Sequence, residues 1–230
     1  MTQHHELRWG GIAGLGYAVL AIVAYFLPGT DAPRIDDSPA TIVAFFADHR
    51  AQVLAQALLL SAAAALLVWF AAALAQTLRD RAQGSDLPGA LLGGIILLAA
   101  LTLAGAGLYA SLAYRVGAPT VMIAAFNLAQ MTYMMYGVAA AVPFTALAIG
   151  IHRTRVLPEW MGWFAAVCAV LGVVGALFIG RTSGAFVPGG PVASLIPFVA
   201  DALFVIAASV FMVREHLPVV GAAPQAMGHA

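Results

Sequence analysis

The sequence predicts an all-α membrane protein, a helical bundle with six transmembrane helices in a single domain over residues 1–230. Two observations indicate this class. Hydrophobic residues make up 63% of the chain and charged residues only 9%, whereas a soluble domain usually has about 25% charged residues. In addition, six apolar segments are close to or longer than the roughly 20 residues that a helix needs to cross a bilayer.

The six predicted spans cover residues 9–27, 53–76, 90–114, 121–151, 160–179 and 192–213. The first span has no clear small-x-small cleavage site before Pro28, so we expect a retained helix rather than a secretion signal. The fourth span is longer than a bilayer requires. We therefore expect it to tilt, to protrude, or to bend near Pro143, which lacks a backbone donor.

The loop after the first span contains the signals of a short amphipathic helix. Ser38 can cap its start, with Pro39 at the first helical position. Its apolar face would carry Ile42, Phe45 and Phe46. We expect this helix to lie at the outer membrane interface and to lead into the second span.

Six spans place both ends of the chain on one side of the membrane. The pairs Arg79/Arg81 and Arg153/Arg155 fall in short loops on that same side, where the positive-inside rule has most force. We therefore expect cytoplasmic termini. All ten cationic side chains are arginine, which together with the richness in Ala and Gly suggests a GC-rich bacterial genome and hence the bacterial plasma membrane.

Several kinds of site are disfavoured by the sequence. The net charge is zero and no basic patch is present, which excludes nucleic acid as a partner. The six histidines show no metal-ligand spacing, and Cys168 stands alone as a small packing residue, so neither a metal nor a cofactor is expected. Membrane lipids are the expected partners, while nothing in the sequence indicates the oligomeric state.

Two pairs of glycines have the Gly-x-x-x-Gly spacing that lets helices approach closely, Gly10 with Gly14 and Gly89 with Gly93. In a six-helix bundle we expect both pairs to pack against helices of the same chain.

Asp201 is the one charged residue deep inside a predicted span. A lone carboxylate at the centre of a bilayer costs about 2.5–3.5 kcal/mol on insertion scales, so a compensating feature is expected. One hypothesis is a proton or cation site, or a weak candidate for a catalytic acid or base. The other is a structural carboxyl that hydrogen-bonds to a neighbouring helix.

The fourth span is the most polar and offers partners for Asp201. Asn127, Gln130, Tyr133 and Tyr136 are the candidate ligand-binding residues beside Asp201. Two interpretations stay open: a pocket for a lipophilic small molecule between the fourth and sixth spans, or interhelical hydrogen bonds in ordinary packing.

Three features resemble uncharacterised multi-pass bacterial membrane proteins of the actinobacterial type, which belong to families of unknown function. They are the stretch from Arg155 to Phe164, the outer-loop helix from Ser38 to Arg50, and the end of the sixth span from Ala207 to Arg214. This resemblance implies a six-helix or similar bundle, and it implies no catalytic residue.

Three function classes remain. The first is a non-enzymatic accessory, sensor or structural protein. The second is a transporter or channel for a small or lipophilic solute that uses Asp201 and the fourth helix. The third is a membrane-embedded isomerase or cyclase that acts on a lipid or terpenoid. The surroundings of Asp201 distinguish these classes. A ligand-sized apolar cavity favours an enzyme or a lipid-binding protein, a water-filled path favours transport, and a closed hydrogen bond favours a structural role.

Overall fold

The structure, a computed structural model, describes residues 2–29, 32–114 and 119–214. Within these ranges the chain contains seven α-helices and no strand. They are α1 (Thr2–Phe26), α2 (Pro39–Asp48), α3 (Arg50–Arg81), α4 (Leu87–Tyr114), α5 (Pro119–Thr154), α6 (Glu159–Ala176) and α7 (Ile196–Val213). All except α2 belong to segments long and apolar enough to cross a membrane, which confirms the predicted all-α bundle with six membrane-spanning helices.

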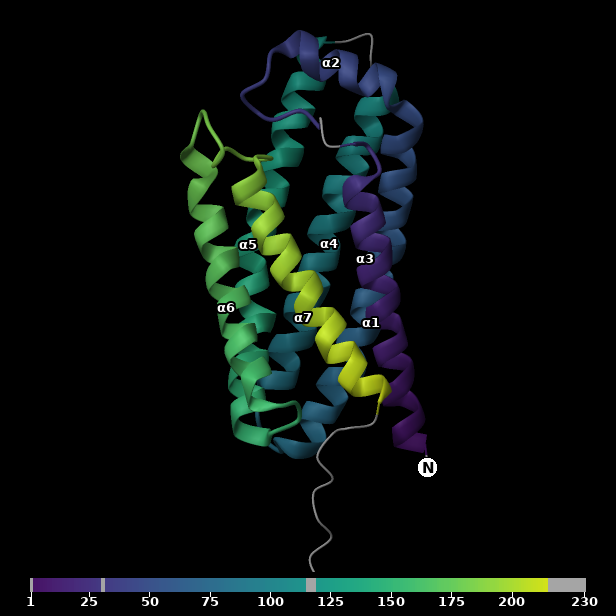
Figure 1. Cartoon of the computed structure of the whole chain (residues 1–230), viewed down its shortest axis with the longest axis vertical. Coiled ribbons are helices and arrows are strands. Elements are labelled where there is room, and N and C mark those ends of the chain that lie inside the picture. Colours follow the sequence, from purple (N-terminus) through teal and green to yellow (C-terminus); the bar gives the residue numbers. More distant parts are fainter. Residues whose placement is uncertain (1, 30–31, 115–118, 215–230) are drawn as a thin grey trace, which may run out of the picture.

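The six long helices form a ring in the order α1, α3, α4, α5, α6 and α7, and α7 returns to pack on α1. Successive long helices are antiparallel, and α7 crosses the bundle diagonally (Figure 1). The start of α1 and the last turn of α7 lie at one end of the bundle, which we call the terminal end. The short helix α2 lies across the opposite end, the α2 end (Figure 1).

The expected amphipathic helix is confirmed in α2. The Ser38 hydroxyl oxygen accepts a hydrogen bond from the backbone N–H of Thr41 at 3.2 Å, and Pro39 occupies the first turn. Its apolar side chains enter a cluster that closes the α2 end of the bundle. This α2-end cluster consists of Ile42, Phe45, Phe46, Val53, Leu112, Ala113, Met122 and Phe126.

A larger apolar cluster fills the terminal half of the bundle with side chains from all six long helices, among them Leu74, Leu98, Ile151 and Phe204. In this half, Pro143 lies within α5, which continues as one helix from Pro119 to Thr154. Gly94 of α4 faces it, and a Cβ there would lie 2.5 Å from the Pro143 Cδ. The absence of a side chain at Gly94 therefore makes room for the proline ring.

The two Gly-x-x-x-Gly pairs have different surroundings. Gly10 lies against Ala73 of α3, and Gly14 lies against Ser209 of α7, so this pair packs within the bundle as expected. The expectation for Gly89 and Gly93 is wrong: both are exposed on α4, with no atom within 4 Å of an added Cβ. The Gly-x-x-x-Gly spacing shows that two small residues lie on the same face of a helix. It does not show whether that face packs against another helix of the bundle.

The backbones of α5 and α6 approach each other closely at Gly137 and Gly172. A Cβ on either residue would lie 2.5 Å from the carbonyl oxygen of the other. Since the obstacle is backbone, it cannot rotate away as a flexible side chain can. Both glycines also line the cavity described below, so this contact sets the distance between two of its walls.

We expect Gly172→Ala to destabilise the protein by about 1–3 kcal/mol, because the added methyl group overpacks the α5–α6 contact. The measurement is the thermal unfolding midpoint of the purified protein in detergent. Gly93→Ala is the matched control, because it makes the same change in a helix where nothing lies within 4 Å. Equal midpoints for the two variants would contradict the close contact.

Candidate functional site

A cavity of about 260 Å³ lies in the bundle between the α2-end cluster and the larger core. All six long helices contribute to its walls, as does η2 (Pro191–Leu195), a π-helical turn that leads into α7. The walls are mostly apolar, with many alanines and glycines. The polar lining residues are Tyr17, Tyr25, Gln56, Thr102, Tyr109, Gln130, Tyr133, Tyr136, Ser194 and Asp201.

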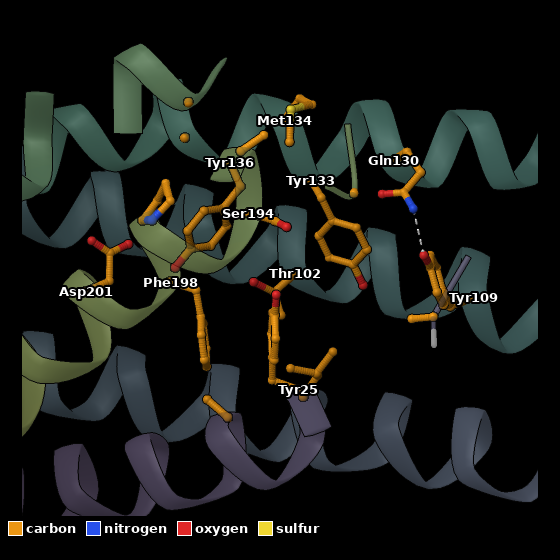
Figure 2. Close-up of a pocket in the computed structure, with 18 of the residues that line it drawn as sticks. Tyr25, Thr102, Tyr109, Gln130, Tyr133, Met134, Tyr136, Ser194, Phe198 and Asp201 are labelled. Carbon is orange, nitrogen blue, oxygen red and sulfur yellow. Dashed lines mark hydrogen bonds between the residues drawn. The ribbon is translucent and has the colours of Figure 1, made fainter. Parts of the chain in front are cut away.

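Asp201 lines one end of this cavity and is only 5% exposed (Figure 2). Within the described part of the chain, its carboxyl forms neither a hydrogen bond nor an ion pair. Among the described residues, the one fully enclosed polar side-chain atom without a partner is the Ser209 hydroxyl, so the Asp201 carboxyl oxygens are not sealed in protein either. Asp201 therefore presents an unpaired carboxyl to the cavity.

Two tyrosines lie at the same end of the cavity as this carboxyl. Tyr17 of α1 and Tyr136 of α5 line the cavity together with Asp201, and the same three residues also line a second, smaller pocket of about 20 Å³. Phe198, one turn before Asp201 on α7, lies at the same end of the cavity (Figure 2). The Asp201 end thus combines one acidic group with aromatic rings and phenol hydroxyls from three helices.

The opposite end of the cavity is built around Gln130 of α5. Its side-chain amide nitrogen donates a hydrogen bond to the Tyr109 hydroxyl at 3.0 Å (Figure 2). Gly189, with a φ of 81°, packs against the same amide, and a Cβ there would lie 2.7 Å from Nε2. Only 4% of Gln130 is exposed, so this end is a tightly packed polar wall.

The long wall between α1 and α7 is formed by an aromatic pair. The rings of Tyr25 and Phe198 are stacked, with centroids 4.6 Å apart and planes at 11°. The lining continues past them to Pro28, Ala32 and Pro33, in the segment between α1 and α2. The cavity is partly open, and its lining reaches the protein surface at Ala32, which is exposed, near the α2 end.

Four of the five predicted site residues meet in this cavity, namely Asp201, Gln130, Tyr133 and Tyr136. Asn127 is partly buried on α5 and is not among the lining residues. On the polar side of α5, Tyr136 lies toward the Asp201 end of the cavity, while Gln130 lies at the other end (Figure 2).

The sequence prediction did not include the polar lining from the other helices, because its candidate residues came only from the fourth and sixth spans. Tyr17, Ala21 and Tyr25 recur every four residues and all line the cavity, which is the spacing of one helix face. That spacing was a usable signal. Gln56 and Thr102 carry no such signal, because each is one of several polar residues in its helix and nothing in the sequence sets it apart from the others.

The described residues contain no group of three His, Cys, Asp or Glu side chains that could hold a metal ion. Among the lining residues, Asp201 is the one carboxyl, and the rest offer hydroxyls, amides and aromatic faces. This set can bind a small molecule through one charge, several hydrogen bonds and a large apolar contact.

Comparison of the chain with protein-family models, with curated proteins and with solved structures gives no match.

We expect Tyr109→Phe to destabilise the protein by about 1–3 kcal/mol, because the buried Gln130 amide loses its hydrogen-bond acceptor. Tyr114→Phe makes the same change at a tyrosine that is 65% exposed, and it should have little effect. Thermal unfolding in detergent measures both. Adding Gln130→Leu to Tyr109→Phe should recover part of the loss, whereas additive losses would show that the two side chains are not coupled.

Proposed function

We propose that this multi-pass membrane protein is a non-enzymatic binding protein that holds a lipophilic small molecule inside its helical bundle. The observation that carries the proposal is the unpaired carboxyl of Asp201 in a largely apolar cavity of about 260 Å³. This volume is just below the roughly 300–1,000 Å³ typical of small-molecule pockets, whose walls are also mostly apolar with a few polar groups.

The arrangement favours binding over a purely structural role for Asp201. A structural carboxyl in a bundle would be hydrogen-bonded to a neighbouring helix, because an unpaired buried polar group costs free energy. Asp201 lacks such a bond within the described residues, and it faces space that a ligand can fill. A sensor or accessory role is compatible with such a site.

The arrangement also favours binding over acid–base catalysis. An isomerase or cyclase that moves a proton usually needs a second acid or base near the first. Glu159 lies at the terminal end, at the start of α6, where it pairs with Arg155. Asp201 therefore has no carboxyl partner among the residues that line the cavity.

Transport of the bound molecule is the second candidate function. The cavity lining reaches the loop after α1 at the α2 end, while the larger apolar cluster fills the terminal half below it. A site open toward one end and closed toward the other is what one state of an alternating-access carrier requires. Release of a bound molecule toward the terminal end would distinguish transport from simple binding.

We further propose that the protein lies in a bacterial plasma membrane with the terminal end in the cytoplasm. Arg79, Arg81, Arg153 and Arg155 gather at this end, and the Arg81 guanidinium donates to the Arg155 carbonyl at 3.4 Å. Such clustering in short loops is what the positive-inside rule associates with the cytoplasm.

We expect Thr102→Phe to abolish binding of a neutral probe, 4-phenylbutan-1-ol, by filling the middle of the cavity. Thr132→Phe is the matched control, since both threonines donate to the carbonyl four residues earlier but Thr132 does not line the cavity. Calorimetric titration of the protein in lipid nanodiscs, corrected with empty nanodiscs, measures binding. Unchanged binding by Thr102→Phe would reject this cavity as the site.

The proposed orientation predicts that alkaline phosphatase fused after Val213 is inactive in bacterial cells, because that enzyme needs an oxidising compartment for its disulfides. The same enzyme inserted after Gly29, at the α2 end, should be active. The reverse result would invert the proposed orientation.

A further inference from the structure

The charge of the lining points to a particular class of ligand. Among the described residues, Asp201 is the one charged side chain that lines the cavity, and no arginine, histidine or lysine pairs with it. A carboxylate buried in apolar surroundings is stabilised by an opposite charge with good contacts. Since the surrounding helices supply none, a positively charged group on the ligand is the complement that the site lacks.

The rings at the same end of the cavity strengthen this inference. Tyr17 and Tyr136 line the same part of the cavity as Asp201, and Phe198 and its stacking partner Tyr25 lie along the adjacent wall. The faces of aromatic rings attract organic cations, and this attraction grows when the cation is removed from water. A carboxyl together with several rings is a common way to hold an ammonium group.

The remaining walls of the cavity indicate the size and polarity of the rest of the ligand. Beyond Asp201 the lining is largely small and apolar, with Ala63, Ala64, Gly137 and Ala176 leaving space where larger side chains would fill the bundle. At the far end, the side chains of Gln130 and Tyr109 are already hydrogen-bonded to each other, so this end does not require a polar group on the ligand. A molecule that fits has one polar head and an apolar body.

We propose that the cavity binds a lipophilic organic cation, with its amine or quaternary ammonium head beside Asp201 and its apolar body extending toward Tyr133. This inference rests on the proposed function, because it assigns the class of molecule that the same cavity holds. It goes further by stating that charge, and not apolar contact alone, selects the ligand.

Three probes of similar shape test the inference: 4-phenylbutylamine, which is a cation at pH 7, the neutral 4-phenylbutan-1-ol, and the anion 4-phenylbutyrate. Each is titrated calorimetrically into the full-length protein in uncharged phosphatidylcholine nanodiscs, with empty nanodiscs subtracted. We expect the amine to bind at least ten times more tightly than the alcohol, and the anion to bind most weakly.

Variants then assign this preference to one carboxyl. Asp201→Asn should remove the tenfold preference for the amine over the alcohol, because the amide keeps the shape of the side chain and loses its charge. Asp201→Glu, which keeps the charge, should retain a preference for the amine. Asp48→Asn is the matched control, since it makes the same change at an exposed carboxylate on α2 that does not line the cavity.

The outcomes separate the two proposals. If the alcohol binds the natural protein as tightly as the amine, or if Asp201→Asn keeps the preference, the cation inference is overturned and the binding function stands. If no probe binds above the empty nanodiscs, the binding function itself is rejected. Should Asp201→Asn fail to fold, the probe series on the natural protein and on Asp201→Glu still decides the question.

Discussion

Helices in hydrocarbon bond their backbone groups internally, so the interior shape of this protein depends on side-chain volume and on how closely the helix axes approach. At the α2 end, bulky residues such as Phe46 and Phe126 fill the space between helices, and at the terminal end Leu74 and Phe204 do the same. Between these two clusters the walls contain many alanines and glycines, and the interior stays open. The cavity is therefore present because the lining between the two clusters has too few large side chains to fill the space between the helices.

Rigid walls make this opening a defined site. On one side, Gly137 and Gly172 bring the α5 and α6 backbones into contact, so these two helices cannot approach more closely there. On the opposite side, the stacked rings of Tyr25 and Phe198 connect α1 to α7. A ligand that enters thus meets preformed walls, so little free energy is spent on ordering the protein when the ligand binds.

The candidate site was only partly predictable from the sequence. Asp201 was visible because a charge within an apolar span is rare, and Gln130, Tyr133 and Tyr136 because they share one polar helix. Gln56 and Thr102 were not visible, because polar residues on different helices can be assigned to one site only once the helices are placed side by side. The same limit explains Asn127 and Gly93, which have suggestive types and spacings but lie outside the site and outside the packed interior respectively.

By itself, the amino-acid sequence determined the class, the six spans and the capped helix α2, because hydropathy, length and capping chemistry are local properties of a segment. It also marked Asp201 as an exception to those local rules. The tertiary structure alone decided which helices are neighbours, which glycines are contacts, and that the Asp201 carboxyl faces open space beside Tyr17 and Tyr136. Those features depend on how each helix is rotated about its own axis and on how the helices cross. The rotation of a helix is predicted from the periodic pattern of its apolar and polar residues, and a helix that is apolar on every side has almost no such pattern.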